Sequence, residues 1–103
     1  MHHLITPEFQ TAFENYPLYS QESNEDPEII VKLFDAYGSA TWYLTEYDPN
    51  DQIAFGYVTG LHEDEWGYVS LRELEEIRHP QLGLPRIERD RHFAQAGFKE
   101  VVR

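Results

Sequence analysis

Carboxylates near one strand end are the side chains of this sequence with the clearest capacity for chemistry. Glu46 and Asp48 alternate along one predicted strand, and Asp51 follows in the next turn. Two such groups can act as a general acid and base, or as ligands for a hard cation. One hypothesis is therefore a small metal-dependent hydrolase, or a nucleic-acid-processing accessory, that uses Glu46, Asp48 and Glu65. Because nineteen of the 103 residues are acidic, acids close together in sequence are expected by chance. We therefore favour the interpretation that these carboxylates are simply solvated at the end of a strand.

Other catalytic and cofactor motifs are not evident in the sequence. The absence of cysteine excludes thiolate zinc sites, iron–sulfur clusters and cysteine nucleophiles. The five histidines lack zinc-site spacing, and the turn at residues 48–51 lacks the later glycine and closing glutamate of a calcium loop. There is no nucleophile elbow and no glycine-rich phosphate loop. The sequence therefore predicts no catalytic residue, no metal and no cofactor.

One dense segment of mixed charge lies near the C-terminus, at residues 87–91. Arg89 could form a bidentate pair with a sheet carboxylate such as Glu46 or Asp48 and so fix this segment. We expect Arg89 and the adjacent Asp90 to act as a structural clamp, with an anion site as the alternative. A further alternative is direct DNA binding through the arginines of this region (Arg86, Arg89 and Arg91).

Negative charge is unevenly distributed along the chain. The formal net charge is −11, and residues up to Leu71 carry thirteen acids and one base, a net of −12. The remainder carries six acids and seven bases. Such a chain is a poor nonspecific ligand for nucleic acids or anionic membranes, because both attract positive charge. The anionic part is either a solubility surface or a surface offered to a basic partner.

Aromatic residues are concentrated in the strand-like segments, and their neighbours are acidic. Stacking on nucleic acid bases would require basic neighbours instead. Core packing is therefore the first expectation for these rings, and a protein-binding face is the second. The candidate acidic and aromatic face comprises Glu46, Asp48, Asp51, Glu63, Asp64, Glu65 and Trp66.

Local patterns predict one α+β domain over residues 1–103. Thr6 and Pro7 begin a helix that Pro17 ends, and a polar loop follows. Four strand-like runs (residues 28–36, 40–48, 52–61 and 66–69) are joined by short turns, which predicts a four-stranded antiparallel meander. Ser70 and Glu73 form a capping box for a second helix that ends near Arg78, and the C-terminal segment is expected to be irregular.

No segment of the sequence has the pattern of a secretion signal or a membrane span. The N-terminus lacks a basic segment followed by an apolar run, and no apolar run approaches the ~20 residues that cross a bilayer. We therefore expect a cytoplasmic protein with no membrane partner.

Several motifs resemble those of a bacterial family of unknown function, DUF2958. They are Pro17–Tyr19, Thr41–Asp48, Ala54–Gly60, Glu65–Leu71, Leu82–Pro85 and Ile87–Asp90, within a similarity that runs from Leu18 to Phe93. The family's closing motif usually continues from the proline directly to Ile-Glu-Arg-Asp, whereas Arg86 intervenes in this chain. The family name assigns no activity. Because its members are common on plasmids, integrative elements and phages, the resemblance implies a role against host defence or in element maintenance.

The leading functional hypothesis is a noncatalytic module whose acidic face binds a basic host protein, with a nucleic-acid-binding protein as the expected class. An acidic surface can occupy the binding site of such a protein by imitating phosphate spacing, and electrostatic steering accelerates the encounter. Direct binding of nucleic acid is not expected.

Overall fold

Helix α1 (Pro7–Ala12) begins where the sequence predicts, in a computed structural model that describes residues 2–102. Thr6 caps the helix by accepting a hydrogen bond from the Phe9 amide at 3.2 Å, and Pro7 occupies the first helical position. The helix ends at Ala12, well before Pro17. Phe9 and Phe13 are buried against the ring of Tyr47, at centroid distances of 4.9 and 5.7 Å.

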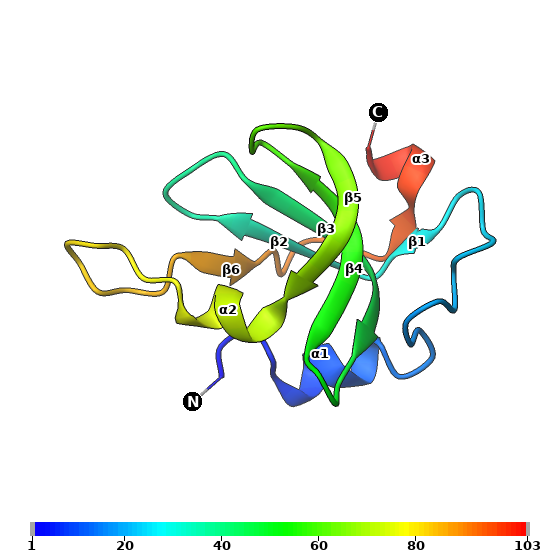
Figure 1. Cartoon of the computed structure of the whole chain (residues 1–103), viewed down its shortest axis with the longest axis horizontal. Coiled ribbons are helices and arrows are strands. Elements are labelled where there is room, and N and C mark those ends of the chain that lie inside the picture. The colour runs from blue at the N-terminus through cyan, green and yellow to red at the C-terminus, as the bar shows by residue number, and fades with distance from the viewer. Residues whose placement is uncertain (1, 103) are drawn as a thin grey trace.

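The central sheet has five antiparallel strands in the order β5–β4–β3–β2–β6 (Figure 1). Four of them form the expected meander: β2 (Val31–Asp35), β3 (Thr41–Asp48), β4 (Ile53–Thr59) and β5 (Glu65–Ser70). The prediction of four strands is corrected by β6 (Ile87–Arg89), which pairs with the free edge of β2. The three residues of β6 are rich in charge and show no strand-like alternation of apolar and polar side chains. The strand forms instead through backbone pairing with a distant strand.

A small second sheet and a third helix replace the irregular C-terminal segment that was expected. The predicted strand over residues 28–36 is divided at Ile30, so that β1 (Glu28–Ile29) pairs with β7 (Ala96–Gly97). Helix α3 (Phe98–Val101) follows and lies beside the loop that precedes β1 (Figure 1). Residues 96–98 therefore pack against β1 and against the rings of Tyr57 and Trp66.

One face of the central sheet forms the hydrophobic core with α1 and α2 (Leu71–Glu76). Ser70 caps α2 by accepting a hydrogen bond from the Glu73 amide at 3.2 Å, as the capping pattern predicts. Leu71 and Leu74 are buried, whereas Ile77 follows the helix and is 39% exposed. Within residues 2–102, no helix has the length and apolarity that a bilayer crossing requires.

A bulge at Thr45 decides which side chains of β3 face the core. Leu44 pairs with Gly56 and Glu46 pairs with Phe55, so Thr45 is an extra residue between them. Simple alternation along a strand would place Leu44 and Glu46 on one face. The bulge instead places Glu46 on the opposite face and directs Tyr47, two per cent exposed, into the core. Close strand packing also explains Gly56, where a Cβ atom would lie 2.3 Å from the Tyr43 carbonyl oxygen.

Candidate functional site

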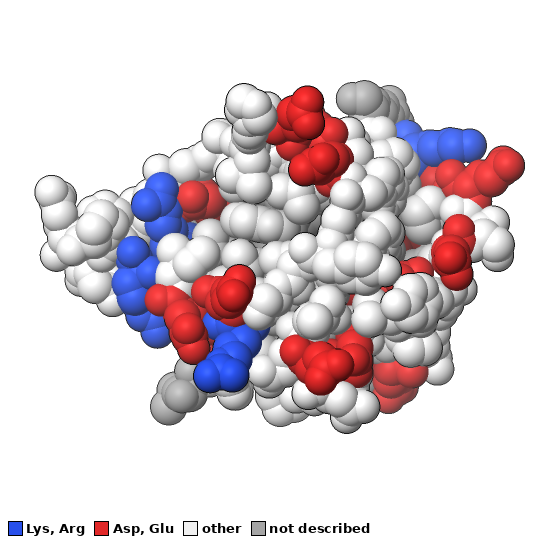
Figure 2. Space-filling view, in the orientation of Figure 1, with Lys and Arg blue, Asp and Glu red and all other residues white. Residues whose placement is uncertain are grey.

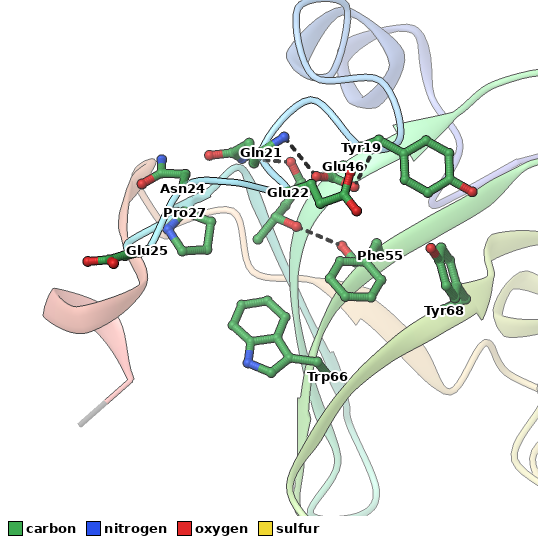
Figure 3. Close-up of a pocket in the computed structure, with 11 residues that line it drawn as sticks. Tyr19, Gln21, Glu22, Asn24, Glu25, Pro27, Glu46, Phe55, Trp66 and Tyr68 are labelled. Atoms are coloured by element: carbon green, nitrogen blue, oxygen red, sulfur yellow. Dashed lines mark hydrogen bonds between the residues drawn. The ribbon is translucent and has the colours of Figure 1, made fainter.

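The main cavity of interest is a groove of about 360 Å³ between the loop over residues 17–27 and the face of the sheet opposite the core (Figure 3). The loop lies above the groove, and β4 and β5 provide its aromatic floor. We call this cavity the aromatic groove. It is lined by Tyr19, Gln21, Glu22, Asn24, Glu25, Pro27, Thr45, Glu46, Phe55, Trp66 and Tyr68.

Glu46 fixes the loop over the sheet. Its two carboxylate oxygens accept hydrogen bonds from the backbone amides of Tyr19 and Gln21, each at 2.9 Å, and the side chain is only 4% exposed. Tyr19 adopts a left-handed backbone conformation with φ of 74°, which turns the chain sharply above the sheet. The sequence placed Glu46 on an exposed acidic face, whereas in the structure this carboxylate is a buried anchor.

Gln21 provides a second anchor at the closed side of the groove. Its side-chain amide donates hydrogen bonds to the carbonyl oxygens of Glu28 and Thr45, each at 2.9 Å. Its side-chain oxygen accepts a hydrogen bond from the Glu28 amide at 2.7 Å. Gln21 thus connects the loop, β1 and the bulge of β3, and these contacts hold the groove in one shape.

The floor of the aromatic groove is a row of rings in contact. Phe55 stacks on Trp66 with centroids 5.7 Å apart and an interplanar angle of 12°, and Tyr68 packs on the other side of Phe55 at 4.9 Å. The indole of Trp66 also contacts Phe98 of α3 at 4.8 Å. Trp66 is 37% exposed and Tyr68 is 58% exposed, so both rings remain partly accessible to solvent.

Negative charge surrounds these rings. Glu22 and Glu25 lie on the loop side of the groove and are exposed, while Glu46 lies beneath it. The neighbouring Tyr19 side chain, partial burial, and the negative charges of Glu46 and Glu22 hold the pKa of Tyr68 above its usual value. The groove therefore combines aromatic faces with a negative potential.

This combination of rings and carboxylates suits a cationic side chain and disfavours a phosphate-bearing ligand. Cations are attracted to the faces of Trp and Tyr rings, and a guanidinium can at the same time hydrogen-bond to a carboxylate. A polyanion would be repelled by the same carboxylates. Among residues 2–102, no three His, Cys, Asp or Glu side chains are grouped so that they could hold a metal ion.

The remaining acids of the predicted face are divided between two ends of the sheet. Asp48 and Asp51 lie at the turn between β3 and β4, where Asp48 accepts a hydrogen bond from the Asn50 amide at 3.0 Å. Glu63, Asp64 and Glu65 lie at the opposite end of β4, where Asp64 accepts a hydrogen bond from the Gly60 amide at 3.1 Å. Figure 2 accordingly shows acidic side chains in several separate groups instead of one continuous patch. Of the predicted face, Glu46 and Trp66 line the aromatic groove.

The C-terminal clamp is built from different partners than the sequence suggested. Asp90 lies 3.5 Å from the Lys32 ammonium, and its amide donates to the Lys32 carbonyl at 2.9 Å. Arg89 is not paired with Glu46 or Asp48. It lies on β6, beside a hollow that Arg91 also lines, and burial followed by the charge of Arg91 lowers its pKa.

Arg86 makes a shorter ion pair than that of Asp90 with Lys32. Its Nε donates to both carboxylate oxygens of Asp35, at 2.9 and 3.1 Å. Its backbone bonds to Ile77 on one side and to Ala36 on the other, so the inserted residue extends the contact between β2 and the chain before β6. Asp35 resists protonation: although burial raises its pKa, the hydrogen bonds from Arg86 and from the Tyr37 amide outweigh this and hold the pKa below its ordinary value.

Sequence reasoning missed the loop side of the groove. Residues 19–27 were interpreted as a solvated loop because they are polar, acidic and without periodicity. The contact of Gln21 with Glu46, which lie 25 residues apart in sequence and are both buried, helps to bring this loop onto the sheet. No local pattern announces such a contact.

A family model described as "Protein of unknown function (DUF2958)" matches residues 4–98, which is most of the chain. The chain belongs to this family. Its DUF2958 region includes every element from α1 to β7 and both sides of the aromatic groove. Comparison with curated proteins and with solved structures gives no match.

Proposed function

We propose that this DUF2958 protein is a noncatalytic protein-binding module that holds a basic segment of a partner protein in the aromatic groove. The observation that supports this most strongly is the groove itself, because the partly exposed rings of Trp66 and Tyr68 line the same cavity as the acidic side chains of Glu22 and Glu25. Arginine is the side chain that best uses both features, because it stacks on aromatic rings and pairs with carboxylates.

The whole-molecule charge supports the same choice of partner. A net charge of −11 attracts basic proteins over long range and raises the rate of encounter at low salt. The groove then provides the short-range specificity that charge alone lacks. Binding should consequently weaken as salt increases, yet depend on the rings at every salt concentration.

Basic segments are typical of proteins that bind nucleic acids, so a host nucleic-acid-binding protein is the proposed class of partner. Occupation of such a segment by this chain would compete with nucleic acid. This would suit an anti-defence role on a mobile element. Mimicry of a nucleic acid's phosphates has less support than binding in a local groove, because the acids near Asp48 and those near Glu65 lie at opposite ends of β4 and the acidic groups of the visible face are separate (Figure 2).

The two other functional hypotheses have less structural support. The enzymatic one needs Glu46, Asp48 and Glu65 together, but the oxygens of Glu46 bind backbone amides and Glu65 lies at the far end of the sheet from Asp48. The DNA-binding one needs free arginines, but Arg86 is held by Asp35, and Glu88 and Asp90 are interleaved with Arg89 and Arg91.

A blocked eight-residue peptide of four arginines alternating with four valines tests the proposal, and we call it the arginine–valine peptide. Its affinity is measured by isothermal titration calorimetry for the wild type and two variants. The double variant Glu22→Gln/Glu25→Gln removes two charges from the groove, and Glu73→Gln/Glu76→Gln removes two charges from α2.

We expect the groove variant to bind about tenfold more weakly and the α2 variant to change affinity less than about twofold. Equal losses of affinity in both variants would mean that the peptide binds by nonspecific charge attraction, which would overturn the proposal. Absence of binding to the wild type would overturn it as well.

A further inference from the structure

We propose that the basic segment binds as an added β-strand along the free edge of β5. This inference rests on the function proposed above and specifies how the partner's backbone is held. Strand β5 is paired on one side only, with β4, and among residues 2–102 it is the longest edge of the central sheet. An exposed edge presents unpaired amides and carbonyls that an extended peptide can bond.

The hydrogen-bond register identifies which backbone groups of β5 face outward. The Leu71 amide donates to the Gln52 carbonyl at 2.9 Å, one step beyond the pair of Ile53 with Ser70. Because bonded and non-bonded pairs alternate in an antiparallel ladder, Gly67 and Val69 bond to β4. The backbone groups of Trp66 and Tyr68 therefore point away from the sheet, next to the rings that form the groove floor.

The two sides of this edge offer different surroundings to the side chains of an added strand. On one side is the aromatic groove, which Trp66 and Tyr68 line. On the other is a hollow of about 380 Å³, lined by Trp42, Val58 and Leu61 among others. Gly67 keeps this second side open, because a Cβ atom placed there would meet nothing within 4 Å. Alternate side chains of a strand point to opposite faces, so a segment of alternating basic and apolar residues fits the edge.

Charge selects a basic partner segment over a second copy of this chain. Glu65 is the charged residue of β5, and Glu63 and Asp64 directly precede it. Edge strands that avoid pairing commonly carry lysine, proline or a bulge, and β5 has none of these. Two copies would bring together molecules of charge −11 each, whereas a basic segment is attracted.

Two N-methylated forms of the arginine–valine peptide test strand addition. One carries methyl groups on the arginine backbone amides and the other on the valine backbone amides. In an added strand, only one of these sets faces β5, since amide direction alternates along the chain. We expect one form to lose at least tenfold in affinity and the other to bind within about threefold of the parent peptide. Equal affinities for the two forms would overturn strand addition while leaving recognition in the groove intact.

Amide hydrogen exchange gives a second, independent measurement on the intact protein. At saturating parent peptide, we expect exchange of the Trp66 and Tyr68 amides to slow at least tenfold, while the Gly67 and Val69 amides are unchanged. Protection without this alternation would overturn the inference. Protection of Trp66 and Tyr68 in the absence of peptide, together with a dimeric mass, would assign the edge to a second copy instead. Failure of the parent peptide to bind at all would contradict the proposed function itself.

Discussion

Individual carboxylates in this protein differ in role far more than their sequence contexts suggest. Glu75 and Glu76 are neighbours on α2, but Glu75 is 7% exposed and Glu76 lies at the surface. One oxygen of Glu75 accepts hydrogen bonds from the amides of Leu4 and Ile5, at 2.5 and 3.0 Å, and the other bonds to the His2 ring. Glu75 therefore holds the N-terminal segment against the core.

Replacement of Glu75 by alanine should lower the free energy of unfolding by about 1–3 kcal/mol at neutral pH, because two buried amides lose their acceptor. Glu76→Ala, which breaks only the exposed pair with Arg72, should change it by less than about 0.5 kcal/mol. Urea denaturation of both variants measures the difference. Similar losses in the two would contradict the anchoring role.

Acid should remove the contribution of Glu75. Burial raises the pKa of this carboxyl, but the hydrogen bonds from His2, Leu4 and Ile5 outweigh burial and hold the pKa below its ordinary value of 4.5. Its stabilisation is therefore fully present above pH 4.5 and is lost as the pH falls through the lowered pKa. The difference in unfolding free energy between wild type and Glu75→Ala should shrink below pH 4.5. A difference that grows in acid would refute this assignment.

Tyr47 carries a buried hydroxyl that has no hydrogen-bond partner among residues 2–102. Burial, followed by the charges of Asp48 and Glu75, raises the pKa of this phenol to about 12. Tyr47→Phe should leave the free energy of unfolding unchanged or raise it by up to about 1 kcal/mol, because the variant buries one polar group fewer. Tyr47→Ala should cost about 3–5 kcal/mol, since a large ring leaves the core. Marked destabilisation by Tyr47→Phe would contradict this expectation, because it would mean that the hydroxyl has a hydrogen-bond partner.

At the scale of elements, local chemistry determined what the sequence could predict. The caps at Thr6 and Ser70 were predicted correctly because their partners lie three residues away. The meander β2–β5 was predicted because short turns permit only antiparallel pairing. Strand β6 and the bulge at Thr45 were not, since both depend on contacts with distant residues. The bulge matters most for the site, because it turns Glu46 toward the loop.

The loop over residues 17–27 should depend on Glu46 more than on any other acid. Glu46→Ala removes the acceptor of two amides, so we expect faster hydrogen exchange at Tyr19 and Gln21 and a loss of about 1–3 kcal/mol in unfolding free energy. Asp48→Ala, two residues along the same strand, is the matched control and should leave exchange in the loop unchanged. Slow exchange at Tyr19 and Gln21 in Glu46→Ala would mean that other contacts hold the loop.

At the scale of the whole molecule, the uneven charge along the chain is only partly an uneven charge in space. Most Lys and Arg of the visible face gather toward the end that holds α2, where acidic side chains lie among them, and acidic groups predominate over the rest of that face (Figure 2). The sequence shows the excess of acid, but it could not predict the groove, whose two sides meet only in the folded chain. We infer that shape and aromatic rings, together with charge, select the binding site.

Chemical-shift mapping tests this claim most directly. The ¹⁵N-labelled protein is titrated with the arginine–valine peptide, and the shift of every backbone amide is followed together with the indole N–H of Trp66. We predict saturable changes concentrated in the loop over residues 17–27 and in β5, with little change near Asp51 or Glu73. Shifts spread evenly over all acidic groups, or strongest away from the aromatic groove, would contradict the account.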